Sequence, residues 1–143
     1  MAGETAALRQ LALRVLAQHS GPAADVKPLV VAARRAYDEL ARVAAPLIGQ
    51  VGVDALTGRA LHLAQREYPW LVPTAEPHQR EGPFAEVLFC LERQSPAVAT
   101  EAAATVFATF TGLLITFIGE PLTVQLLQKA WPNGFSEPST GGT

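Results

Sequence analysis

The sequence predicts an all-α protein, a compact bundle of about six helices around a central apolar helix at about 96–118. Three observations favour this fold class. An uncharged run at 102–119 is too long for an ordinary strand and lacks the alternation of polar and apolar residues that strands show. Apolar residues recur at helical spacing in the segments on both sides of this run. No segment of the sequence has the pattern of a β-strand.

Local signals define the ends of the central helix. Ser95 can accept hydrogen bonds from the first free amides of a helix, and Pro96 suits the first helical position because the N–H that it lacks would be unpaired there. Gly119 and Pro121 mark the end, since glycine favours the residue after a helix and proline cannot continue one. We therefore expect a single helix over 96–118.

The two sides of this helix differ in side-chain size. Bulky residues line one side, while small residues recur at every fourth position on the other, Gly112 and Thr116 among them. Three interpretations follow: a buried core helix whose small side receives a neighbouring helix, a helix that inserts into or spans a membrane, or a seam between two copies of the chain. We favour the core helix, because a helix apolar on all sides usually lies inside a small protein. Gly112 and Thr116 are candidate interaction residues.

Further segments have amphipathic patterns and are expected to form helices at about 5–19, 26–45, 54–67, 84–93 and 122–131. Pro46 predicts a kink or an end of the second of these helices, because it lacks an N–H and clashes with the preceding turn. Gly49 and Gly52 then predict a corner, and Asp54 is the expected cap of the next helix. Prolines recur over 69–83 and predict an ordered loop.

Composition limits the classes of function. The chain has 143 residues, and we expect one helical domain over 1–132 followed by a disordered polar tail over 133–143. Only 17% of the residues are charged while 49% are apolar, so either the core is large or a partner covers apolar surface. The net charge of −2 offers no basic excess to neutralise phosphates, so we expect no nucleic-acid partner.

Cysteine usage and the N-terminal segment bear on the compartment. Cys90 is the only cysteine, so no disulfide can form within the chain, and this usage fits a reducing environment. Arg9 and Arg14 interrupt the apolar residues near the N-terminus, which therefore lacks the continuous apolar region of a secretory signal. We expect a cytoplasmic protein.

Side chains with catalytic or metal-binding chemistry are few and scattered. The histidines, His19, His62 and His78, lie in different segments and share no spacing typical of metal ligands. No nucleophile elbow, phosphate-binding loop or dinucleotide fingerprint occurs. We therefore expect no metal, no cofactor and no catalytic residue.

One basic helix side is a candidate binding surface. Arg59, His62 and Arg66 share a side of the expected helix 54–67. His62 resembles the phosphotransfer histidines of two-component signalling in lying on a helix, but Gln65 and Arg66 stand where that pattern has lysine and glycine. We expect a solvated histidine instead.

Aromatic residues next to prolines are the last candidates. Tyr68 and Trp70 flank Pro69, and Trp131 precedes Pro132 at the end of the last expected helix. Tyrosine and tryptophan anchor many interfaces because they combine a large apolar area with a polar tip. The competing interpretation, which we favour, is that both tryptophans close the ends of the core.

The leading hypothesis is a non-enzymatic helical module for protein–protein interaction or regulation. It self-associates or binds a protein partner through an apolar or small-residue helix face. Two alternatives stay open. One is a membrane-associated protein that inserts or spans with helix 96–118, and the other is a small-molecule binder or minor enzyme with a pocket between helices near Arg59, His62 and Arg66.

Overall fold

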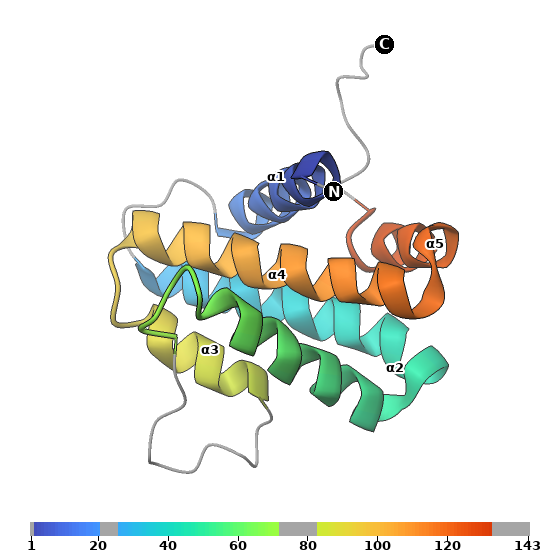
Figure 1. Ribbon diagram of the computed structural model, residues 1–143. Coiled ribbons are helices and arrows are strands. Elements are labelled where there is room, and N and C mark those ends of the chain that lie inside the picture. The colour runs from blue at the N-terminus through green and yellow to red at the C-terminus, as the bar shows by residue number, and fades with distance from the viewer. Residues whose placement is uncertain (1, 21–25, 72–82, 133–143) are drawn as a thin grey trace.

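The structure is a computed structural model that describes residues 2–20, 26–71 and 83–132. These residues form the helices α1 (Ala2–Ser20), α2 (Val26–Ala64), α3 (Pro83–Leu91), α4 (Pro96–Ile118) and α5 (Glu120–Ala130) and contain no strand. The all-α prediction is confirmed (Figure 1). The expected tail over 133–143 and most of the expected loop over 69–83 lie outside the described residues.

Two helices, α2 and α4, form the centre of the bundle. Each of them packs against every other helix, whereas α1, α3 and α5 pack only on this central pair. In Figure 1, α4 crosses the middle of the molecule, with α1 on one side, α3 on the opposite side and α5 at its C-terminal end. The core therefore lies around α4, as the uncharged run predicted, but α2 shares its central position.

The predicted ends of α4 are confirmed. The Ser95 side chain accepts a hydrogen bond of 3.4 Å from the backbone N–H of Val98, and Pro96 occupies the first turn. At the other end Gly119 adopts a φ of 94°, and its N–H donates to the Ile115 carbonyl at 2.8 Å. A positive φ at the residue after a helix is a conformation that glycine adopts without the steric cost of a Cβ.

Threonines in α4 make hydrogen bonds within the helix itself. Each hydroxyl donates to a backbone carbonyl in the preceding turn, at 2.7 to 3.2 Å, and the threonines concerned are Thr100, Thr105, Thr109, Thr111 and Thr116. Because these hydroxyls are already paired, the threonines need no polar partner from another helix. The polar residues of α4 are thus compatible with apolar surroundings.

The expected helices 26–45 and 54–67 are the two arms of a single element, α2. The backbone breaks at Gly49, where φ is 82° and ψ is 156°, while Pro46 lies inside the helix. The corner that the glycines predicted is therefore present at Gly49. Asp54 lies within the second arm and caps no separate helix, because that arm continues directly from the break and ends at Ala64. We call 26–48 the N-terminal arm of α2 and 50–64 its C-terminal arm.

A chain of aromatic rings links the helices through the core. Tyr37 of α2 stacks on Phe84 of α3 with 4.1 Å between ring centroids. Phe84 contacts Phe107 of α4 at 5.5 Å, and Phe107 meets Trp131 edge to face at 5.7 Å. The first pair is stacked and the second is tilted, while the third has the edge-to-face geometry that aromatic rings favour. This chain fixes α3 and the end of α5 onto the central pair.

Candidate functional site

A hollow between the N-terminal arm of α2 and α3 is the first candidate. Two adjoining depressions of about 310 and 400 Å³ share three lining residues, Val30, Val31 and Glu92. The other lining residues are Val26, Lys27, Arg34, Ala85, Leu88 and Phe89. We call this combined depression the α2/α3 hollow. Most of these lining residues are apolar. Exposed apolar surface of this kind is unfavourable in water, so it marks a candidate binding surface.

Val31 lies at the edge of the α2/α3 hollow and is unusually accessible. Its side chain is 64% exposed, whereas Leu29, two residues before it, is buried in the core. Charged residues flank the apolar lining: Lys27 and Arg34 come from α2, and Glu92 follows α3. None of these three charged side chains forms an ion pair within the described part of the chain.

A second hollow of about 470 Å³ lies between α2 and α5. Its lining residues are Arg42, Val43, Pro46, Leu47, Leu122, Gln125, Leu126 and Lys129. The charged residues among these are the cations Arg42 and Lys129, and the Arg42 guanidinium pairs with Glu39 at 2.6 Å. We call this depression the α2/α5 hollow.

Three apolar side chains project into solvent at one end of the bundle. Leu47 and Val51 flank the break in α2 and are 50% and 83% exposed, and Phe117 near the end of α4 is 64% exposed. The break in α2 and the C-terminal end of α4 lie at the same end of the molecule, beside α5 (Figure 1). We call these three residues the bend-end group.

The basic side of the expected helix 54–67 is solvent-exposed. Arg59 and His62 lie on the C-terminal arm of α2, and Arg66 lies in the turn that follows. None of the three lines the α2/α3 hollow or the α2/α5 hollow. Among the described residues, no group of three or more His, Cys, Asp and Glu is placed to hold a metal ion. His78 lies outside the described residues.

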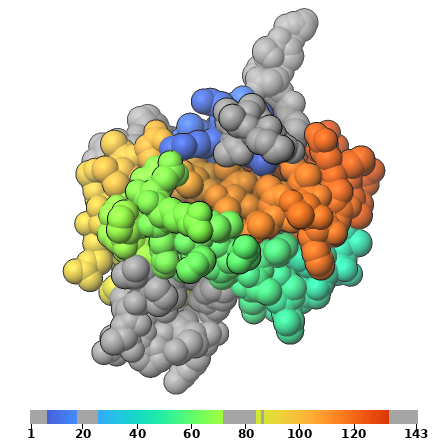
Figure 2. Space-filling model, in the orientation of Figure 1, coloured from blue at the N-terminus to red at the C-terminus, as the bar shows by residue number. Residues whose placement is uncertain are grey.

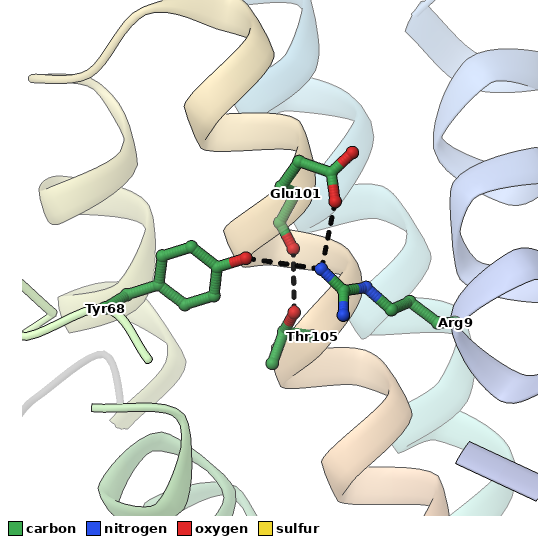
Figure 3. A network of polar contacts seen from close by, with 4 residues as sticks. All are labelled: Arg9, Tyr68, Glu101 and Thr105. Atoms are coloured by element: carbon green, nitrogen blue, oxygen red, sulfur yellow. Dashed lines mark hydrogen bonds and ion pairs between the residues drawn. The ribbon is translucent and has the colours of Figure 1, made fainter. Parts of the chain in front are cut away.

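Tyr68 belongs to a polar network that joins three parts of the chain. One guanidinium nitrogen of Arg9, on α1, donates to the Tyr68 hydroxyl at 3.3 Å and to the Glu101 carboxylate at 2.9 Å (Figure 3). The Thr105 hydroxyl donates to the backbone carbonyl of Glu101 at 2.9 Å. The network ties α1 to the N-terminal half of α4 and to the residues after α2, and its ion pair is largely solvated.

The other predicted residues fall into two environments. Trp131 is buried, and Trp70 is half-buried with its ring edge to face against Tyr68 at 5.8 Å. Gly112 and Thr116 lie on the less buried side of α4, and a strip of α4 reaches the surface between α1 and the C-terminal arm of α2 (Figure 2). Outside the backbone of α4 and the two adjoining residues, no atom of the described residues lies within 4 Å of a Cβ built on Gly112, so none of the other described helices is packed closely there.

Sequence reasoning missed Val31 and the hollow beside it. The predicted apolar stripe of helix 26–45 contains Leu29 and Val30, and Val31 falls outside that stripe. The sequence did contain a signal, because the five consecutive apolar residues from Leu29 to Ala33 exceed what one buried stripe of a helix can accommodate. The hollow itself is made by two helices that are distant in sequence, which no local pattern records.

Membrane-spanning capacity is confined to one helix in the described ranges. Of those residues, only α4 is long and apolar enough to cross a bilayer, and half of its most apolar 18-residue window is buried by the protein itself. Core helices of soluble proteins have the same properties.

Comparison of the chain with known protein families, with curated proteins and with solved structures gave no match.

Proposed function

We propose that this chain is a helical protein-interaction module that associates with further copies of itself. The α2/α3 hollow is the observation that carries this proposal. Its apolar lining faces solvent, and the exposed Val31 stands at its edge. Covering such a surface removes apolar area from water, which stabilises an assembly by about 25 cal/mol for each Å² of apolar area buried.

The low charge of the chain supports the same role. Only 17% of its residues are charged, so the surface carries fewer groups that would oppose association.

The residues with potential chemistry, Arg59, His62 and Arg66, are exposed on a helix and on the turn after it. An interaction module requires no such chemistry, since apolar complementarity is sufficient to hold two surfaces together.

Sedimentation equilibrium over a concentration series tests the proposal. We expect the average mass to rise from the 15.2 kDa of one chain toward twice that value as the protein concentration increases. A mass equal to one chain at every concentration, up to the solubility limit, would contradict self-association.

Membrane association is the second candidate function. The bend-end group favours it, because Leu47, Val51 and Phe117 expose apolar area at one end of the bundle. Apolar side chains at a protein surface can enter the boundary between lipid headgroups and acyl chains. Co-sedimentation with lipid vesicles tests this role. We expect Phe117→Ser to reduce the bound fraction if the role is correct, and recovery of all the protein in the supernatant would contradict it.

A further inference from the structure

We infer that two copies of the chain dock through the α2/α3 hollow in a two-fold arrangement, with Val31 of each copy filling the hollow of the other. This inference rests on the proposed self-association and names the surface that performs it. In a two-fold dimer the same patch is used by both copies, so the patch must be complementary to itself. A self-complementary patch needs a projecting group and a recess side by side.

The shape of the face meets that requirement. Val31 is the projecting group, since 64% of its side chain is exposed. The recess lies directly beside it, because Val31 itself lines both depressions of the hollow together with Val30. A two-fold axis that passes between Val31 and the recess therefore places each valine opposite the recess of the other copy. The contact formed in this way is apolar in its centre, as the cores of protein interfaces are.

The charges around the hollow are also self-complementary. The α2 side carries the cations Lys27 and Arg34, and the α3 side carries the carboxylate of Glu92. A two-fold contact pairs residue i with residue j and residue j with residue i. When α2 of one copy faces α3 of the other, Lys27 and Arg34 face the partner subunit's Glu92 on both sides of the axis. The three charged groups make no ion pair within the described part of one chain, so they are free to pair across the interface.

The α2/α5 hollow lacks this property. Among the described residues, the charged ones that line it are the cations Arg42 and Lys129. Arg42 is already paired with Glu39, so two copies docked through this hollow would gain no complementary charge pair from these lining residues. The α2/α3 hollow is therefore the better of the two docking surfaces for a second copy of the chain.

Matched aspartate substitutions at two exposed valines test the inference. Val31→Asp would place a carboxylate against the apolar recess, and we expect it to weaken the dimer at least about tenfold in sedimentation equilibrium, since moving a carboxylate from water into an apolar recess is costly. Val51→Asp is the control, because Val51 is even more exposed on the same helix and lies outside the α2/α3 hollow. We expect it to leave the dimer unchanged. Circular dichroism and thermal melting verify that both variants fold.

Charge exchange gives a second, independent test. Glu92→Lys would set like charges opposite each other and weaken the dimer, and adding Lys27→Glu to it would restore association because the pair is then reversed across the interface. A dimer that survives Val31→Asp would overturn the inference and leave self-association standing, whatever the effect of Val51→Asp. A wild-type chain that is monomeric throughout the concentration series would overturn the proposed function, and the inference with it.

Discussion

The indole N–H of Trp131 donates a hydrogen bond of 3.0 Å to the backbone carbonyl of Ala36, 95 residues earlier in the sequence. The two groups are buried, and the bond joins the end of α5 to the middle of the N-terminal arm of α2. Trp131 also contacts Phe107 of α4 edge to face. One side chain thus holds three elements together, which explains why a tryptophan close to the end of the last helix lies inside the core.

We expect Trp131→Phe to destabilise the protein by about 1–3 kcal/mol, because the change removes the hydrogen bond to Ala36 and leaves a small cavity. Urea-induced unfolding, followed by circular dichroism, measures the free energy of unfolding. Trp70→Phe is the matched control, since Trp70 is only half-buried, and we expect a loss below about 1 kcal/mol. Equal losses for the two variants would contradict the role assigned to Trp131.

Tyr37 predicts a specific dependence of stability on pH. Burial raises the pKa of Tyr37 above its ordinary value of 10.0. The hydrogen bond of 2.8 Å between its hydroxyl and that of Thr57 lowers the pKa, but this effect is smaller than that of burial. The folded protein therefore keeps the phenolic proton to a higher pH than the unfolded chain does. The resulting stabilisation is complete below pH 10.0 and is lost as the pH rises toward the pKa of the folded state.

Tyr37→Phe should remove that dependence. We expect the free energy of unfolding of the wild type to fall above pH 10.0 more steeply than that of the variant, which has no proton to lose at this site. Near neutral pH the variant should lose only about 0.5–1.5 kcal/mol, because Thr57 keeps its hydrogen bond of 2.8 Å to the Val53 carbonyl. Parallel pH profiles for wild type and variant would contradict the assignment of this effect to Tyr37.

The ion pair between Arg9 and Glu101 is expected to contribute little. Its side chains are 32% and 54% exposed, and water and salt screen charges at such positions. A double-mutant cycle with Arg9→Met and Glu101→Gln should give a coupling energy below about 1 kcal/mol that decreases further in high salt. A larger coupling energy that does not respond to salt would contradict this account and would mean that the network in Figure 3 is a principal tie between α1 and α4.

The sequence predicted those parts of the fold that depend on neighbouring residues. Ser95 and Gly119 cap α4 through groups only three or four residues away, so the sequence alone identified both ends. The corner in α2 also depends on neighbouring residues, but the sequence offered two positions for the break, Pro46 and the glycines that follow it. Pro46 is tolerated inside the helix, and the chain turns at Gly49, because only glycine adopts this backbone conformation at low cost.

Features that join distant segments were not predictable in this way. The bond from Trp131 to Ala36 spans 95 residues, and the pair of Arg9 and Glu101 spans 92. The α2/α3 hollow likewise exists only because Val31 and Phe89 are brought together by tertiary packing. His62, a candidate chosen by its chemical type, proved to be exposed and outside the hollows. Most residues that line the α2/α3 hollow are apolar types that are equally common in cores.

Two glycines of α2, Gly49 at the break and Gly58 in the C-terminal arm, allow the bend to be tested directly. Gly49→Ala should destabilise the protein by about 1–3 kcal/mol, because φ is 82° there and a Cβ is strained at that angle, even though no more distant part of the described chain comes within 4 Å of it. Gly58→Ala is the matched control: it also has open space for a Cβ, and its helical backbone suits alanine, so we expect a gain of up to about 1 kcal/mol. Urea-induced unfolding of both variants measures the difference. Equal stabilisation by the two alanines would mean that the chain does not turn at Gly49.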